Sequence, residues 1–178
     1  LNVEGRPHLA FADGRFPTPS GKIEFYSAQM AAEGLDPLPA YEPALEGREG
    51  DPELRSRYPL QMVAVPNHHF LNSSFCDVPR MREKEVRPSL EIHPRDAAER
   101  GIADGDLVRV WNDRGQCRLH AKVVDSVLPG VVASTGLWWP RYVPDGGVNR
   151  LTPSRLADMG GGATFFSNLV QVERARAR

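Results

Sequence analysis

A β-hairpin is predicted by Leu107-Val-Arg-Val-Trp-Asn-Asp-Arg-Gly-Gln-Cys-Arg-Leu-His-Ala-Lys-Val123. From Gln116 to Val123, polar and apolar residues alternate, which is the period of two that a half-buried β-strand requires. The apolar run Leu107 to Trp111 forms the partner strand, and Asn112-Asp-Arg-Gly115 is a tight connection in which we expect Gly115 to take the left-handed backbone conformation. An antiparallel pair of strands is therefore the centre of the predicted fold.

Further short strands are predicted on both sides of this hairpin. A helix is expected from Pro94 to Arg100, because proline favours the first helical position and Gly101 follows its end, with His93 as the capping residue. Short strands separated by one short helix and by long crossing loops favour a small, mainly β barrel. The additional strands are expected at residues 59–65, 89–93, 130–135 and 169–172.

The N-terminal third has a different composition. Residues 1–57 are rich in Pro, Gly and acidic residues, which favours an extended arm that lies on another surface. Within the arm, the alternation in Gly21-Lys-Ile-Glu-Phe-Tyr26 predicts a short strand, and Ser27 to Glu33 can form one or two helical turns. We therefore divide the chain into an arm, residues 1–57, and a barrel domain, residues 58–178.

Composition excludes several classes of function. A formal net charge of −1 and scattered basic residues give no surface for nucleic acid. No run approaches the ~18 apolar residues of a membrane span, so direct membrane insertion is not expected. Glycine and proline, 16 of each in 178 residues, exceed the usual share of about 12% and favour ordered loops.

Residues capable of catalysis are present without the partners that catalysis needs. Cys76 and Cys117 form no CxxC pair, so we expect reduced thiols, which favours the cytoplasm over the periplasm. His68 and His69 are adjacent in sequence and lack a partner at helical spacing, which argues against a dedicated metal site. No GxSxG or comparable nucleophile elbow occurs. We predict neither a catalytic residue nor a metal ligand within this chain.

Ligand-binding chemistry is concentrated in the last third. Glycines let backbone N–H groups approach an anion, Asn149 offers a donor and an acceptor to a heterocycle, and aromatic rings offer stacking faces. Alone, the Gly160 to Gly162 run fits a linker, and tryptophans are more often packing groups. Their grouping favours binding in Gly136-Leu-Trp-Trp-Pro140, Gly146-Gly-Val-Asn-Arg-Leu-Thr-Pro153 and Asp158-Met-Gly-Gly-Gly-Ala-Thr-Phe-Phe166.

Several segments, taken in order along nearly the whole chain, resemble the C-terminal part of molybdopterin oxidoreductases of the dimethyl sulfoxide reductase family. The resemblance implies a molybdopterin dinucleotide-binding domain, which in that family is a six-stranded double-psi β-barrel. It rests on Thr18-Pro-Ser-Gly-Lys-Ile-Glu-Phe-Tyr-Ser27, His69-Phe-Leu-Asn-Ser-Ser-Phe75, Ile92-His-Pro-Arg-Asp-Ala-Ala-Glu-Arg-Gly-Ile-Ala-Asp-Gly-Asp106, Val148-Asn-Arg-Leu-Thr152 and Asp158-Met-Gly-Gly-Gly-Ala-Thr-Phe165.

The same resemblance implies which residues contact the cofactor, bis(molybdopterin guanine dinucleotide) with molybdenum or tungsten. Asn149 matches the asparagine of the family's Asn-x-Leu-Thr segment, and the loop from Pro66 to Phe75 follows the first barrel strand. Asp96 and Asp106 are expected to be turn and cap residues. The implied cofactor-binding residues are Asn67, His68, His69, Asn72, Ser73, Trp138, Trp139, Asn149, Gly161 and Phe166.

In that family the molybdenum ligand, the substrate funnel and any iron–sulfur cysteines lie in other domains. We therefore expect a fragment or subunit of a larger enzyme, with no redox turnover and poor cofactor affinity of its own. Its expected partners are the remaining domains, with an iron–sulfur or membrane subunit as a further candidate. Residues 6–46 and 138–143 should then expose apolar surface that those domains cover.

Two alternatives from other classes remain. A stand-alone double-psi barrel could bind a protein or a nucleotide, because such barrels host unrelated functions. Against it stands the Pro-rich arm, which a self-sufficient module does not need. A small barrel enzyme of the decarboxylase type ranks lower, since no activated nucleophile or self-processing Gly-Ser site is evident.

Overall fold

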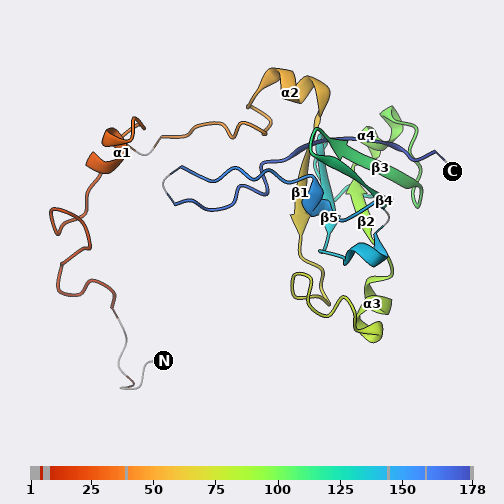
Figure 1. Ribbon diagram of the computed structural model, residues 1–178, viewed down its shortest axis with the longest axis horizontal. Coiled ribbons are helices and arrows are strands. Elements are labelled where there is room, and N and C mark those ends of the chain that lie inside the picture. Colours follow the sequence, from red (N-terminus) through yellow and green to blue (C-terminus); the bar gives the residue numbers. More distant parts are fainter. Residues whose placement is uncertain (1–4, 6–8, 39, 144, 159, 177–178) are drawn as a thin grey trace. The chain divides into compact units, whose positions relative to one another are not determined.

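The computed structural model describes residues 5, 9–38, 40–143, 145–158 and 160–176 (Figure 1). The chain divides into two compact units, residues 1–42 and residues 43–178. Residues 43–57, which we assigned to the arm, thus group with the barrel. No helix in the described part of the chain is long and apolar enough to cross a membrane.

Six strands of the second unit form a closed barrel in the order β1-β5-β2-β4-β3-β6. The pairs β1–β5 and β2–β4 are parallel, and the remaining neighbours are antiparallel. The six-stranded, mainly β barrel predicted from sequence is confirmed. Its strands are β1 (Leu60–Val65), β2 (Ser89–Ile92), β3 (Leu107–Asn112), β4 (Gly115–Val123), β5 (Val131–Thr135) and β6 (Leu169–Arg174).

The helices are short. The predicted helix is present as α4 (Pro94–Glu99). The Arg95 backbone N–H donates to Nδ1 of the capping residue His93 at 3.1 Å. Asp96 lies in the first turn of α4 and accepts from the Gly130 N–H at 2.7 Å, so it fixes the crossing before β5. The other helices are α1 (Ala28–Ala32), α2 (Pro52–Arg57), α3 (Pro79–Glu85) and the 3-10 turns η1 (Pro140–Tyr142) and η2 (Val148–Arg150).

The hairpin of β3 and β4 forms as predicted, with Asn112 opposite Gly115. Alternation along β4 buries Cys117, Leu119 and Ala121 inside the barrel. The left-handed conformation expected for Gly115 is wrong, because its φ is not positive. A Cβ atom there would lie 3.3 Å from the Arg150 carbonyl oxygen, a close contact that favours glycine at this position.

The barrel interior is apolar and closely packed. Leu60, Met62, Leu90, Ile92 and Val132 are each at most 1% exposed and belong to one contiguous cluster. Burial of such a side chain stabilises the fold by about 1.5–3 kcal/mol. This core holds the strand ends, and therefore the loops that leave them, at fixed positions.

The first unit contains no strand among its described residues, so the strand predicted at residues 21–26 is wrong. Gly21 takes φ +67°, and the Thr18 hydroxyl donates to the Lys22 carbonyl at 2.6 Å, so the segment forms a local turn. The expected helical turns are present as α1, which Ser27 caps. Phe25, 80% exposed, is left uncovered by its own unit.

Candidate functional site

The parallel strands β1 and β5 end at the same edge of the barrel, where Val65 lies opposite Thr135. The loop after β1 begins at Pro66 and the loop after β5 begins at Gly136, whose N–H donates to the Val65 carbonyl at 2.8 Å. Ligands commonly bind where neighbouring parallel strands end. The candidate site lies around this edge.

Asn67 is the most informative side chain at this edge. It is only 7% exposed, and neither its Oδ1 nor its Nδ2 has a hydrogen-bond partner among the described residues. Gly136 lies against it with φ +72°, and a Cβ there would lie 2.1 Å from Asn67 Nδ2. An unpaired buried amide costs about 1–3 kcal/mol, which indicates a polar group that it is placed to meet.

An apolar groove of about 480 Å³ opens beside these residues, which we call the β1–β5 groove. Its volume lies in the range of small-molecule sites. Three predicted cofactor-binding residues, Asn72, Asn149 and Phe166, line it. The remaining lining comes from Ala64, Val65, Pro66, Gly136, Leu137, Thr152, Pro153, Ala163 and Phe165.

Two further hollows adjoin the same edge. One, of about 490 Å³, is lined by Ser73, Trp138 and Trp139 and shares Leu137 and Asn149 with the β1–β5 groove. The other, of about 340 Å³, is lined by Asn67 and His68 together with the cationic side chains Arg87 and Lys122. Most predicted site residues therefore lie around one edge of the barrel, divided among adjacent hollows.

The two tryptophans differ in exposure. Trp138 is 7% exposed, packs edge-on against Phe70 with ring centroids 5.0 Å apart, and donates to the Thr135 carbonyl at 3.2 Å. The Trp138 ring is therefore used for packing. Trp139 is 38% exposed and donates to the Ser73 carbonyl at 2.8 Å. Within residues 138–143, the apolar surface expected from sequence is limited to Trp139 and Pro140, because Trp138 and Val143 are buried.

Histidine 69 is tied to α3. Its Nδ1 lies 2.8 Å from Glu85 Oε1, and its backbone N–H donates to the same oxygen at 2.6 Å. The neighbouring His68 ring is 4.8 Å away, edge-on. The described residues include no group of three or more His, Cys, Asp or Glu side chains that could hold a metal. His69 therefore anchors the loop after β1.

A polar cluster that the sequence did not reveal joins this loop to η1. The Tyr142 hydroxyl donates to Asp77 at 2.9 Å and accepts from Arg82 at 2.8 Å, and Arg141 forms an ion pair with Asp77. The hydrogen bond from Tyr142, followed by the charge of Arg141, lowers the pKa of the Asp77 carboxyl. The segment after β1 and the loop after β5 are thus held together by these contacts.

The remaining predicted residues lie on the loop between η2 and β6. This loop extends away from the barrel as two adjacent segments joined by a bridge between Leu156 and Ala163 (Figure 1). Gly161, at φ +58°, has open space around it. The rings of Phe165 and Phe166 lie 4.5 Å apart, and both are about half exposed.

Both thiols are buried and free. Burial, with a smaller contribution from the charge of Asp145, raises the pKa of the Cys117 thiol to about 12. A neutral thiol inside a barrel is a poor nucleophile at physiological pH. Cys76 accepts a long hydrogen bond from the Trp139 N–H, at 3.4 Å, so it belongs to the packing beneath the loops.

Comparison with protein families decides the identity of this unit. Residues 60–169 match the family described as "Molydopterin dinucleotide binding domain". The chain belongs to this family. Its barrel is the molybdopterin dinucleotide-binding domain found in oxidoreductases of the dimethyl sulfoxide reductase family, as the sequence resemblance implied.

Similar proteins are much longer. The chain is 48% identical to "Probable oxidoreductase YoaE" of Bacillus subtilis over 90% of its own length and 22% of that protein. It is 40% identical to "Dimethyl sulfoxide reductase DmsA" of Escherichia coli, covering 88% and 21%. Acetylene hydratase from Pelobacter acetylenicus superposes with a TM-score of 0.75 at 25% identity, covering 91% and 24%.

The chain thus spans about a fifth of the length of the curated relatives it matches. None of these matches supports the alternative of a stand-alone module. The relatives carry further domains beside the region that corresponds to this chain, which agrees with the expectation that the barrel works within a larger protein.

Proposed function

We propose that this barrel closes over bis(molybdopterin guanine dinucleotide) in a larger molybdenum oxidoreductase whose full-length chain carries out oxygen-atom or electron transfer. The observation that carries the proposal is the unpaired amide of Asn67 at the edge where β1 and β5 end. Pterin and guanine edges present adjacent donors and acceptors, which an asparagine amide can match with its oxygen and its NH₂ group.

The residues present fit such a group. Asn67 would hydrogen-bond a heterocycle at the buried end of the edge, and the exposed Asn149 would do so at the mouth of the β1–β5 groove. The rings of Phe165 and Phe166 offer apolar faces on the other wall. The bound cofactor supplies the redox chemistry of its metal, while these residues bind it, orient it and exclude water.

The loop after β1 supplies the remaining contacts in this proposal. Asn72 lines the groove, Ser73 lines the adjoining hollow, and His68 lies beside Asn67 near Arg87. We assign His69 and Trp138 to holding the loops, because His69 bonds to Glu85 and Trp138 is buried. Trp139 and Gly161 remain candidates for direct contact from the two other loops.

The metal ligand, the substrate-binding surface and any electron-transfer partner belong, in this proposal, to the rest of the parent enzyme. Expected partners are its remaining domains and an iron–sulfur or membrane subunit. The chain alone should bind the cofactor weakly and show no turnover with artificial dyes. The two reduced, buried thiols favour a cytoplasmic parent.

The test is a metal and nucleotide analysis of the full-length protein purified from its own cells. We expect a polypeptide several times longer than this chain, with molybdenum or tungsten and about two guanosine monophosphates per metal after acid hydrolysis. The isolated 178-residue chain, treated identically, is the control and should retain little of either. A full-length protein without guanine nucleotide would contradict the proposal.

A further inference from the structure

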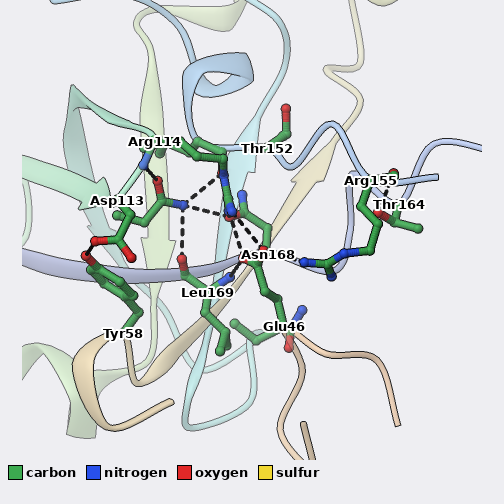
Figure 2. Close-up of polar contacts among 12 residues, drawn as sticks. Glu46, Tyr58, Asp113, Arg114, Thr152, Arg155, Thr164, Asn168 and Leu169 are labelled. Atoms are coloured by element: carbon green, nitrogen blue, oxygen red, sulfur yellow. Dashed lines mark hydrogen bonds and ion pairs between the residues drawn. The ribbon is translucent and has the colours of Figure 1, made fainter. Parts of the chain in front are cut away.

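A buried carboxylate lies outside the β1–β5 groove, at the base of the loop that forms one of its walls. Glu46 is 4% exposed and accepts two hydrogen bonds from Arg114, from Nη1 at 2.8 Å and from Nη2 at 2.7 Å (Figure 2). Two parallel charge-assisted bonds fix both position and orientation. Arg114 sits in the turn between β3 and β4, so this pair joins the segment before α2 to the hairpin.

The same arginine holds both ends of the groove-lining loop. Its Nε donates to the Leu151 carbonyl at 2.7 Å, just before the loop, and its Nη2 donates to Asn168 Oδ1 at 3.1 Å, just after it. The intervening residues include Thr152, Pro153, Ala163, Phe165 and Phe166, all of which line the β1–β5 groove.

Asn112 reinforces the two ends. Its Nδ2 is shared among the carbonyls of Leu151 and Leu169, at 2.8 and 3.1 Å, and Asn168 Oδ1 at 3.1 Å. Its Oδ1 accepts from the Arg114 backbone N–H at 3.0 Å. We call Glu46, Asn112, Arg114 and Asn168 the Glu46 cluster (Figure 2).

Glu46 also reaches into the loop. Arg155 Nη2 lies 3.9 Å from Glu46 Oε1, and the Arg155 carbonyl accepts from the Thr164 hydroxyl at 2.8 Å. Gln61 of β1 donates to the Phe166 carbonyl at 2.8 Å, so the returning segment is tied to the barrel as well. The carboxylate therefore connects the outgoing and returning segments of the loop with the hairpin.

A compact turn presents Glu46 to this cluster. The Asp51 N–H donates to the Leu45 carbonyl at 2.9 Å, which folds residues 45–51 back on themselves. At Gly50 a Cβ would lie 2.2 Å from the carbonyl oxygens of Ala44 and Leu45, so only glycine fits. The turn thereby gives Glu46 a defined place against Arg114 of the β3–β4 hairpin.

We propose that Glu46 is a positioning residue that sets the β1–β5 groove for the molybdopterin dinucleotide by holding the loop of residues 152–167 through Arg114 and Arg155. The inference rests on the proposed function for the identity of the ligand. Glu46 does not line the groove, so its effect on the ligand passes through the loop. Loss of its charge should loosen the loop and speed cofactor release while the strands stay closed.

The experiment compares Glu46→Gln with Glu173→Gln in the full-length cofactor-loaded protein. Glu173 pairs with Arg109 on the barrel surface at 3.2 Å with its side chain 53% exposed, so it is a matched carboxylate outside the cluster. Hydrogen exchange is followed at Ala157, Gly161 and Thr164, whose amides bond within the loop. Release of guanine nucleotide and metal after dilution is timed in parallel.

For Glu46→Gln we expect about tenfold faster exchange at the loop amides and about tenfold faster release, with exchange in β1 to β5 unchanged. Glu173→Gln should match wild type in both measurements. Arg114→Lys keeps the positive charge but loses the two-pronged hydrogen bond to Glu46, so loop exchange and cofactor release should both become faster. This variant serves as the test if Glu46→Gln does not fold.

Equal loop exchange and equal release in Glu46→Gln and Glu173→Gln would overturn the inference, and so would a uniform rise in exchange across all strands. Wild-type protein that contains no guanine nucleotide would instead contradict the proposed function. In that case the loop exchange would still show whether Glu46 holds residues 152–167.

Discussion

Two buried asparagines of this domain have opposite surroundings. Asn112, 8% exposed, uses its Nδ2 toward Leu151, Asn168 and Leu169 and its Oδ1 toward the Arg114 N–H. Asn67, 7% exposed, has no hydrogen-bond partner for either side-chain atom within the described residues. The two side chains are almost equally buried, yet Asn112 uses both of its polar atoms in hydrogen bonds and Asn67 uses neither.

The difference separates a structural amide from a binding amide. Hydrogen bonds to buried groups contribute to folding, whereas an unpaired buried amide costs folding free energy unless something outside the fold supplies its partners. Asn112 thus belongs to the part of the barrel that holds the chain together. Asn67 belongs to the part that the folded chain leaves ready for a ligand, beside the β1–β5 groove.

Asn112→Ala should give the largest effect on stability. It removes three donor contacts from Nδ2 and the acceptor of the Arg114 N–H, so we expect a loss of about 3 kcal/mol in the free energy of unfolding. Urea unfolding of the chain measures this. Asn149→Ala, at an exposed position, is the control and should change stability by no more than ~0.5 kcal/mol. Equal effects of the two substitutions would break the comparison.

Gly136→Ala should rank second, with a loss of about 2 kcal/mol. The new Cβ would collide with the Asn67 side chain at 2.1 Å and would also sit at φ +72°. Gly130→Ala separates the two causes, because Gly130 has φ +83° and nothing within 4 Å of its Cβ position. Gly136→Ala should lower the free energy of unfolding more than Gly130→Ala does. Equal losses would show that the close approach to Asn67 does not affect stability.

Asn67→Ala should leave the cofactor-free chain at least as stable as wild type, since it removes a buried amide that makes no hydrogen bond there. In the full-length protein the same substitution should lower cofactor retention about tenfold. Thermal unfolding of the chain and nucleotide content of the full-length protein are the two measurements. A loss of stability as large as that of Asn112→Ala would show that Asn67 is structural.

The burial of Cys117 inside the closed barrel should make the free energy of unfolding depend on pH in the alkaline range. At pH 7 this dependence is absent. The folded pKa of Cys117, about 12, lies above that of a solvated thiol, ~8.5, so folding favours the protonated form. The folded state binds more protons than the unfolded state between these values. The contribution of Cys117 to stability should therefore be constant below about pH 8 and fall as the pH rises toward 12. Cys117→Ala should flatten this part of the curve, and identical slopes would contradict the burial.

Local patterns predicted the barrel because its strands carry their own information. The alternation from Gln116 to Val123 and the Pro94 and Gly101 limits of α4 required no long-range contact to be recognised. The strand expected at residues 21–26 failed because alternation alone cannot supply a partner strand. The left-handed conformation expected for Gly115 was wrong. The close contact with Arg150 that favours glycine there arises from tertiary packing, which the local sequence does not show.

The site was partly predictable for the same reason. The resemblance pointed to the loops of Asn67 and Asn149, and the structure places both at the edge where β1 and β5 end. Glu46 was missed because its importance depends on Arg114, 68 residues away, and nothing in its Pro- and Gly-rich neighbourhood distinguishes it. Trp138 lies in a sequence segment whose composition is typical of a binding site. Its ring packs against Phe70 instead, a contact that the sequence alone does not show.

Hydrogen exchange of the full-length protein with and without its cofactor tests the central claim most directly. We predict slower exchange in the loaded protein at residues 66–73, 136–139 and 149–153 and at 163–166, with no change in the hairpin of β3 and β4. Protection confined to the hairpin, or no difference between the two forms, would contradict binding at the edge marked by Asn67.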